Sequence, residues 1–519
     1  MVDLERVTVA GASIEYDWIP EREVSPEGSR NMRSFDPLAA VHPVFRLGLS
    51  LLAFLTFVGC ADAGQKDSQP AEQASGDSAF LDEVQARTFR FFWERSNPAT
   101  GLTPDRWPTQ SFDSIAATGF ALTAYPIGVE RGWVSREAAR ERTRMTMEFL
   151  WSSPQDSSIA GSTGYQGFFY HFLEPDTGLR FRDVELSTVD TALLLAGVLF
   201  CQSYFDEDHP DAERIRELAE QLYRRVDWSW ASIRGPAIGH GWRPESGHLP
   251  YDWRGYNEAM LLYLLALGSP THPVPSEAWA VWTAGYQWGE FEGQEYLCFG
   301  PLFGHQYTQV WLDLGGIQDE SIHGRVNDYF ENSRRAVRAQ FAYAQENPLR
   351  WTGYGASLWG LSACDGPVNG EHLFKGERRS FNTYWARGAS ALGANDDGTI
   401  APTAAGASII FAPELVLPAL RDMKSRYGEL LYGEYGFLDA LNPSFTFADV
   451  EVQHGKVHPD LGWFDTDYLG IDQGPILCMI ENYRTGLIWN HMRKNPHVIR
   501  GLRRAGFTGG WLDAADAEP

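Results

Sequence analysis

The sequence predicts an all-α fold, a toroid of paired helices joined by long, aromatic-rich loops with only minor β-hairpins. About ten to twelve helices are expected between residues 79 and 493, and they arrive in pairs along the chain. The segments between the pairs are long and collect Trp, Tyr, Asp and Glu. Short apolar strands do not alternate with helices and no fixed repeat is visible, which excludes a Rossmann fold and a regular solenoid.

The first 78 residues are expected to lie outside this fold. Residues 47–60 form an apolar run too short to span a bilayer, with Arg33 and Arg46 before it and a polar stretch after it. That layout is typical of an export signal, and its end, Phe57-Val58-Gly59-Cys60, resembles a bacterial lipobox. The alternative is a buried hydrophobic helix near the N-terminus, which neither caps nor an amphipathic period support.

An export signal should begin close to its start codon, so we expect Met32 to be the true start. The resulting organisation has four parts. They are residues 1–31, which are not part of the mature protein, a signal peptide over 32–59, a flexible tether over 60–78 that begins at a lipidated Cys60, and one domain over 79–519.

Helices of the first half follow from apolar spacing and from caps. Leu81, Val84, Phe91 and Phe92 share one helical face, and Ser135 is a good N-cap with Glu137 in the first turn. The expected helices cover 81–92, 114–131, 135–151, 193–205 and 215–226. Aromatic and glycine-rich loops lie between them, at 161–182 and 228–250.

The second half repeats this pattern. An apolar helix is expected from Glu258 through Leu267, ending at the breaker Gly268-Ser269-Pro270. Further helices are expected at 276–288, 326–345, around 381–392, 412–426 and 474–493. The stretch before Gly324 is read as a glycine-rich aromatic loop, and most of 351–403 as irregular.

Composition narrows the class of ligand. The formal net charge of -25 repels phosphate backbones and anionic lipid head groups, while 19 Trp suit a carbohydrate-binding cleft. The five Cys are far apart, and Gly-x-Ser-x-Gly, Walker, His-Glu-x-x-His and EF-hand motifs are missing from the sequence. The 13 His show no ligand spacing, so no essential metal is predicted.

With those motifs absent, the remaining candidates for catalytic residues are the Asp and Glu that lie among aromatic residues. Cleavage of a glycosidic bond needs one carboxylic acid to protonate the leaving oxygen and one carboxylate to activate water or to attack. Glu258 and Asp472 each stand at the start of an apolar helix, where burial would raise the pKa of Glu258 and make it a proton donor. Both could instead be helix N-terminal acids without a catalytic role. Three clusters qualify: Asp183, Glu185 and Asp190; Asp252 and Glu258; and residues 462–475 with Asp465 and Asp472.

Four motifs then point to one family. Residues 255–260 (GYNEAM), 268–272 (GSPTH), 300–307 (GPLFGHQY) and 470–476 (GIDQGPI) resemble the bacterial glycoamylase-like domain, and more narrowly glycoside hydrolase family 144, the endo-β-1,2-glucanases. The resemblance covers roughly residues 79–493. It implies an (α/α)6 toroid, no cofactor, and hydrolysis of β-1,2-linked glucan with inversion at the anomeric carbon.

The resemblance also implies roles for single residues. Glu258 would be the general acid and Asp472 the base, with Asp465 and Asp439 as alternatives for the base. Expected sugar contacts are Trp253, His305, Gln306 and Trp385, together with the acids Asp183, Glu185, Asp190, Asp252 and Asp465.

We therefore expect a monomeric bacterial glycoside hydrolase, lipid-anchored in the periplasm or at the cell surface, that cleaves β-1,2-glucan internally. An exo-acting relative or a transglycosylase remains an alternative. A phosphorylase is disfavoured because few Arg or Lys lie in the acid clusters. A non-catalytic glycan-binding lipoprotein would use the aromatic residues but gives no reason for acids at helix starts.

Overall fold

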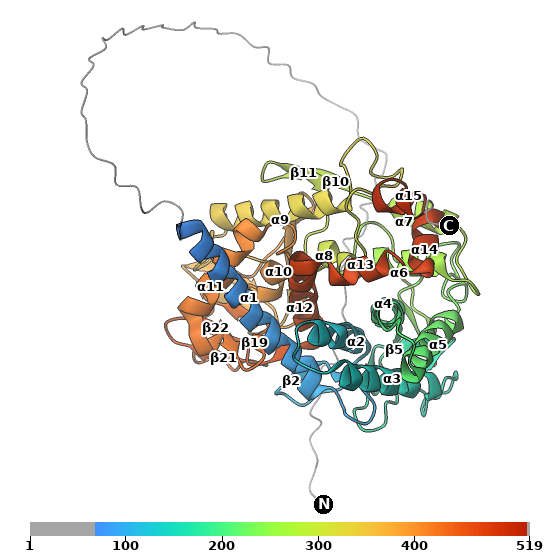
Figure 1. Cartoon of the computed structure of the whole chain (residues 1–519). Helices are drawn as coiled ribbons and strands as arrows, with labels where there is room; N and C mark the ends of the chain where they lie inside the picture. The colour runs from blue at the N-terminus through green and yellow to red at the C-terminus, as the bar shows by residue number, and fades with distance from the viewer. Residues whose placement is uncertain (1–67, 516–519) are drawn as a thin grey trace, which may run out of the picture. The chain divides into compact units, whose positions relative to one another are not determined.

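The computed structural model describes residues 68–515, which form helices joined by loops that carry short strands (Figure 1). The chain divides into two units, Met1–Gly76 and Asp77–Pro519, and the second unit holds every residue of the candidate site. The expected signal peptide, Met32 and Cys60 lie outside the described residues. No helix within the described part is long and apolar enough to cross a membrane.

The helices of the described residues occur throughout the chain. They are α1 (Ser68–Arg95), α2 (Ile115–Glu130), α3 (Arg136–Ser152), α4 (Thr188–Tyr204), α5 (Pro210–Arg225), α6 (Met260–Gly268), α7 (Glu277–Thr283), α8 (Phe303–Trp311), α9 (Tyr329–Glu346), α10 (Pro402–Gly406), α11 (Pro413–Tyr427), η1 (Gly428–Leu430, a 3-10 helix), α12 (Gly470–Thr485), α13 (Leu487–Met492), α14 (Pro496–Arg504) and α15 (Gly510–Ala514). The helical class expected from the sequence is confirmed.

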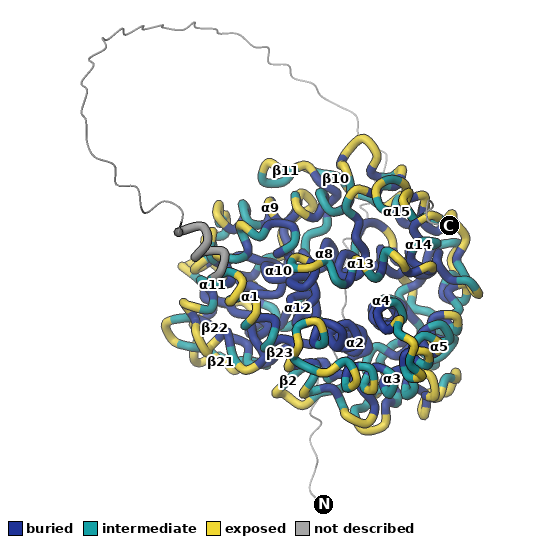
Figure 2. The backbone as a smooth tube through the Cα atoms, in the orientation of Figure 1, coloured by how far each residue is buried: buried dark blue, intermediate teal, exposed yellow. Residues whose placement is uncertain are grey.

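Up to α12, even-numbered helices are inner and odd-numbered helices are outer. Every residue of α6, α8 and α10 is buried, and so are most residues of α2, α4 and α12. In contrast, α3, α5, α9 and α11 bury one face only, as their amphipathic sequences require. Figure 2 shows the difference as dark blue inner helices within a mixed outer layer.

The inner helices contact one another in chain order. Helix α2 packs against α4, α4 against α6, and α6 against α8. Helix α8 is joined to α10 through Gln306, whose Nε2 donates to the carbonyl of Ala404 at 2.9 Å. Helix α10 packs against α12, and α12 packs back against α2. Each inner helix therefore has the preceding one as a neighbour.

All strands of the described residues lie in segments that lead from an odd-numbered helix into the next even-numbered helix. Before α2 come β1 (Thr103–Pro104), β2 (Arg106–Trp107) and β3 (Asp113–Ser114); before α4, β4 (Gly164–Tyr165), β5 (Phe168–Tyr170), β6 (Phe172–Leu173) and β7 (Leu186–Ser187); before α6, β8 (Gly241–Arg243) and β9 (Gly247–His248); before α8, β10 (Trp288–Phe291) and β11 (Gln294–Leu297); before α10, β12 (Ala363–Cys364), β13 (Gly370–Phe374), β14 (Glu377–Phe381), β15 (Trp385–Ala386), β16 (Gly388–Ser390) and β17 (Gly393–Asn395); before α12, β18 (Tyr432–Gly433), β19 (Gly436–Phe437), β20 (Leu441–Asn442), β21 (Lys456–His458), β22 (Gly462–Phe464) and β23 (Tyr468–Leu469).

Strand pairs connect these segments to one another. Antiparallel pairs β3–β6, β7–β8 and β2–β23 join the segments before α2, α4, α6 and α12. A bridge between Ile400 and Leu441 joins the segments before α10 and α12. The connections that leave the even-numbered helices carry no named strand in the described range. The starts of the inner helices and the strand-bearing loops therefore share one end of the helices, which we call the strand-bearing end.

Several expected elements are corrected by the structure. Residues 381–392 are not a helix but the end of β14 followed by β15 and β16, because Gly388 and Gly393 favour hairpin turns over helix. Residues 303–311, expected as loop, form α8. Residues 68–78, expected as tether, belong to α1, whose start contains Pro70 and the helix-favouring run 71–74.

Two boundaries also move. The helix expected at 474–493 begins at Gly470 and is divided at Gly486, whose left-handed backbone (φ 69°) ends α12 and precedes α13. The helix expected at 276–288 ends at Thr283, and Trp288 already opens β10. Asp472 is consequently inside the first turn of its helix, whereas Glu258 lies two residues before α6.

Candidate active site

Buried acids gather at the strand-bearing end, beside the starts of inner helices. Asp190 is in the first turn of α4, Asp472 in the first turn of α12, and Glu258 immediately precedes α6. A helix N-terminus favours a nearby carboxylate because its amide groups carry partial positive charge. The placement of Glu258 and Asp472 at helix starts agrees with the sequence interpretation.

The densest group of acids, here called the acid cluster, contains five aspartates that are each at most 3% exposed: Asp365, Asp439, Asp465, Asp467 and Asp472. Backbone pairing brings their segments together. The amide of Asp365 donates to Oδ2 of Asp439 at 2.7 Å, and the amide of Asp439 donates to the carbonyl of Asp467 at 3.0 Å. The amide of Asp465 donates to the carbonyl of Ala440 at 2.9 Å.

Arg106 brings positive charge to this cluster. It lies on β2, whose pairing with β23 places Arg106 opposite Leu469, just before α12. Its Nη1 lies 2.6 Å from Oδ2 of Asp365 and 3.7 Å from Oδ2 of Asp467, and its Nε lies 3.4 Å from Oδ2 of Asp105. One guanidinium thus faces several carboxyl groups, and the excess negative charge must be relieved by protons.

Asp439 and Asp472 share a hydrogen bond between their carboxyl groups. Burial, followed by the charges of Asp472 and Asp365, raises the pKa of Asp439 well above its usual value. Burial also raises the pKa of Asp472 to about 7, where the hydrogen bond from Asp439 and the charge of Arg106 oppose a larger rise. The hydrogen bond raises the pKa of Asp439 and lowers that of Asp472, so the proton of this pair is held on Asp439 in preference to Asp472.

The geometry at Asp365, Asp439 and Asp465 is also compatible with an oxygen-liganded cation. One oxygen of each lies within 4.8 Å of the other two. Burial and the neighbouring carboxylates raise the pKa of Asp465 well above its usual value, so protons compete with a cation for these oxygens. The expectation of a metal-free site stays a prediction.

A second group of ionisable residues joins the acid cluster through Asp105. His171 lies 3.0 Å from Oε1 of Glu185 and 3.5 Å from Oδ2 of Asp190. Burial alone would lower the pKa of His171, but Asp190, Glu185 and Asp105 raise it to about 9. Burial would raise the pKa of Glu185, but His171 brings it down to about 2. His171 is therefore an imidazolium that holds two predicted sugar contacts in place.

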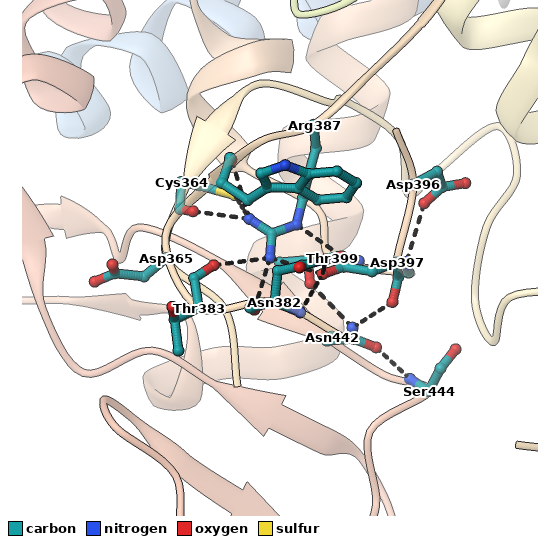
Figure 3. A network of polar contacts seen from close by, with 12 residues as sticks. Cys364, Asp365, Asn382, Thr383, Arg387, Asp396, Asp397, Thr399, Asn442 and Ser444 are labelled. Carbon is teal, nitrogen blue, oxygen red and sulfur yellow. Dashed lines mark hydrogen bonds and ion pairs between the residues drawn. The ribbon is translucent and has the colours of Figure 1, made fainter. Parts of the chain in front are cut away.

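Next to Asp365, a buried ion pair organises the loop before α10 (Figure 3). Arg387 donates to both carboxylate oxygens of Asp397 at 2.7 and 2.8 Å, and to the carbonyl of Cys364 at 2.8 Å. Its remaining donors reach the carbonyls of Asn382 and Thr383. Asp365 follows Cys364 and points away from the guanidinium into the acid cluster (Figure 3). We call this arrangement the Arg387 network.

The predicted aromatic contacts have different surroundings. Trp385 is half-buried on β15 opposite Cys364, which puts it one residue from Asp365 in the β12–β15 pair. Trp253 is buried, and its Nε1 donates to Oγ1 of Thr188 at the start of α4. Both positions border the acids of the strand-bearing end.

His305 and Gln306 are buried in α8 rather than displayed on a loop. The Nε2 of His305 lies 3.1 Å from the carbonyl of Phe299, and burial lowers the pKa of its imidazole to about 4. The side-chain amide of Gln306 donates to the carbonyl of Ala404 and to the hydroxyl of Ser408, both on the neighbouring segment. Gln306 therefore holds α8 against α10.

The other predicted acids, Asp252 and Asp183, are not members of the acid cluster. Asp252 is bound by Arg234, with Nη2 and Nε at 2.6 and 3.0 Å from Oδ1. Asp183 is exposed on the loop before β7, and the structure does not bring it into either buried group.

Sequence reasoning missed Asp105, Arg106, His171, Asp365 and Asp467. The turn-forming run Cys364-Asp365-Gly366-Pro367 inside an otherwise apolar, aromatic segment is the signal that could have indicated Asp365. Arg106 sits on a two-residue strand whose partner is more than 350 residues away, and no local pattern encodes such a pairing.

The chain is similar to proteins of known fold and activity. The model of the family described as "Putative glucoamylase" matches residues 250–496. A crystal structure of a putative glucoamylase from Bacteroides uniformis is 32% identical, with a TM-score of 0.70, over 84% of this chain and 98% of that one.

Two further relatives have described activities. An exo β-1,2-glucooligosaccharide sophorohydrolase (non-reducing end) of Parabacteroides distasonis is 28% identical over 542 aligned positions, covering 95% of this chain and 69% of that protein. An endo-β-1,2-glucanase from Chitinophaga pinensis, solved with sophorotriose and glucose, is 26% identical with a TM-score of 0.71, covering 84% of this chain and 99% of that one.

Proposed function

This chain belongs to the glycoamylase-like family of glycoside hydrolases, and from that premise we propose that it hydrolyses β-1,2-glucan by an inverting mechanism. The observation that carries the proposal is the Asp439–Asp472 pair at the start of α12, in which one buried carboxyl keeps a proton and the other is free to take one. The narrower relationship to glycoside hydrolase family 144 fits the activities of the two described relatives.

Asp472 is the general base of this proposal. As a carboxylate that accepts a hydrogen bond from Asp439, it can take a proton from water attacking the anomeric carbon. Asp439 and Asp465, the alternatives from the sequence, have pKa values raised well above the usual range, which favours their protonated forms. That difference in protonation favours Asp472.

Glu258 is the proposed general acid. It is 6% exposed and leads into α6, whose nine residues are all buried. This buried carboxyl group is the proposed proton donor to the leaving oxygen. Trp253, five residues earlier, contacts the start of α4 and would border the same substrate unit.

We propose that cleavage is internal, as in the C. pinensis relative, and that the six inner and six outer helices up to α12 close into an (α/α)6 toroid. The return contact of α12 with α2 supports the closed arrangement. Release of a disaccharide from the non-reducing end, as the P. distasonis relative is named for, is the second candidate.

The proposal for location follows from the sequence alone. We propose that the chain starts at Met32, is exported, and is lipidated at Cys60 as a monomeric enzyme outside the cytoplasm. Lipid labelling of the protein expressed from Met32 in a bacterium tests this. Label retained in Cys60→Ser would contradict it.

The test of the activity is incubation of the purified protein with linear β-1,2-glucan, following reducing ends, product sizes and anomeric configuration. We expect a ladder of short oligosaccharides with inverted configuration, and the same rate after dialysis against EDTA. A single disaccharide would replace the endo mode by the exo mode. Larger glycosides that retain their configuration would indicate transglycosylation.

Glu258→Gln is the matched variant for the acid. It should lose about 10²- to 10⁴-fold in rate because the proton donor is removed, while oligosaccharide affinity stays within a few-fold. Product formation near the wild-type rate would refute Glu258 as the acid. Binding of glucan without hydrolysis by the wild-type protein would favour the glycan-binding alternative.

A further inference from the structure

Among the large apolar side chains of the described residues, Tyr251 stands out because it is aromatic, 65% exposed and close to the site. It lies seven residues before Glu258, in the loop before α6 at the strand-bearing end. Ile233, also exposed, is next to Arg234, whose Nη2 donates to the carbonyl of Tyr251 at 2.9 Å. A tyrosine ring offers a large, flat apolar face to a ligand, with a hydroxyl group at its tip.

The backbone that presents Tyr251 is held firmly. Its carbonyl also accepts from the amide of His240 at 3.0 Å, and Asp252 bridges to Gly239 while its carboxylate is bound by Arg234. The ring is thus exposed on an ordered support and loses little freedom when a ligand covers it.

Ring contacts connect the exposed Tyr251 through His240 to the buried Trp253. The ring centroid of Tyr251 is 6.1 Å from that of His240, and His240 stacks on Trp253 at 3.9 Å with an interplanar angle of 17°. Trp253 in turn donates to Thr188, two residues from Asp190. Burial lowers the pKa of His240 to about 4, so this path of rings is uncharged at neutral pH. A glucose ring has two apolar C–H faces and hydroxyl groups around its edge. The flat, uncharged aromatic rings can contact the faces, and the charged groups beside them can form hydrogen bonds with the hydroxyl groups.

We propose that Tyr251 is an outer binding platform for a glucosyl residue remote from the bond that is cleaved. This inference rests on the proposed function and adds the residue that sets the preference for long chains. The occupant is a unit of the enzyme's own β-1,2-glucan, because the platform is continuous with Trp253. Tyr251 takes no part in proton transfer.

Steady-state kinetics of Tyr251→Ala on a long β-1,2-glucan and on the shortest oligosaccharide that is hydrolysed test the proposal. We expect KM for the long chain to rise about three- to tenfold with kcat unchanged, since the contact is the same in the ground and transition states. Values for the short substrate should not change. Tyr251→Phe keeps the ring and should behave as wild type.

The matched control is Tyr483→Ala, which removes another exposed tyrosine, 40% exposed near the end of α12 and away from the strand-bearing end. Equal KM values for the Tyr251→Ala and Tyr483→Ala variants on the long chain would overturn the platform. An equal loss on short and long substrates would also overturn it, since it would show a structural role. Failure of the wild-type protein to cleave β-1,2-glucan would instead refute the proposed substrate, which separates the two proposals.

Discussion

Two buried ionic clusters lie next to each other along the segment that carries Cys364 and Asp365, and they are built in opposite ways. In the Arg387 network one cation meets one carboxylate, and the remaining guanidinium donors reach backbone carbonyls. In the acid cluster five carboxyl groups are buried together, Arg106 pairs with Asp365 and Asp467 among them, and Oδ2 of Asp465 is buried without a hydrogen-bond partner among the described residues.

The pKa values of the carboxyl groups in the two clusters differ accordingly. Burial would raise the pKa of Asp397, yet Arg387 holds it below the usual value, so the pair stays charged and fixed. In the acid cluster burial raises the pKa of Asp472 to about 7 and that of Asp439 well above its usual value. In the Arg387 network every charge has a partner, and the ion pair forms a rigid support. In the acid cluster the carboxyl groups outnumber the cations, and their pKa values shift toward neutral pH, as proton transfer in catalysis requires.

The largest expected effect comes from Asp472→Asn. Removing the base should lower kcat/KM on β-1,2-glucan by about 10²- to 10⁴-fold. The thermal midpoint should stay level or rise, because repulsion with Asp365 and Asp105 is relieved. Asp208→Asn, on the exposed connection between α4 and α5, is the control. Loss of activity that only parallels unfolding would contradict the role.

Asp397→Asn should show the reverse behaviour. It leaves the buried guanidinium of Arg387 without its counter-ion and should destabilise the fold by about 3–5 kcal/mol in urea titrations. Under conditions where the variant is folded, kcat should change little. Glu377→Gln, which breaks the exposed pair with Arg350, should change stability by no more than about 1 kcal/mol. Equal effects of the two variants would refute the distinction between the clusters.

A smaller effect is expected at His171. Its pKa is raised from 6.5 to about 9, so its stabilising contribution is complete below pH 6.5 and is lost as the pH rises through about 9. The wild-type protein should lose up to about 3 kcal/mol more than His171→Asn over that interval. Unfolding midpoints measured at both ends of the interval report this difference. Parallel losses in the two proteins would show that His171 carries no charge in the fold.

Sequence patterns predicted the parts of this site that are local. The apolar runs after Glu258 and within the Gly470–Ile476 motif predicted two helices, each with an acid at its start. Such a prediction is possible because a helix and its first turn are encoded within a few residues. The helices of the first half followed from similar local signals.

Contacts between distant segments could not be predicted in this way. Arg106 meets Asp365 and Asp467 only because β2 pairs with β23. His305 and Gln306 were expected on a loop because glycines surround them, yet tertiary burial makes that stretch helical. The ionisation of Asp472 likewise depends on Asp439, Asp365 and Asp105, which only the folded chain brings together.

The pH dependence of kcat/KM for the wild-type protein tests the central claim most directly. Asp472 must be ionised to act as the base, so the rate on β-1,2-glucan should fall as the pH drops through about 7, while fluorescence shows that the protein stays folded. A rate that stays level down to about pH 5 would mean that the base is an ordinary carboxylate, and would contradict a catalytic role for the crowded carboxyl groups.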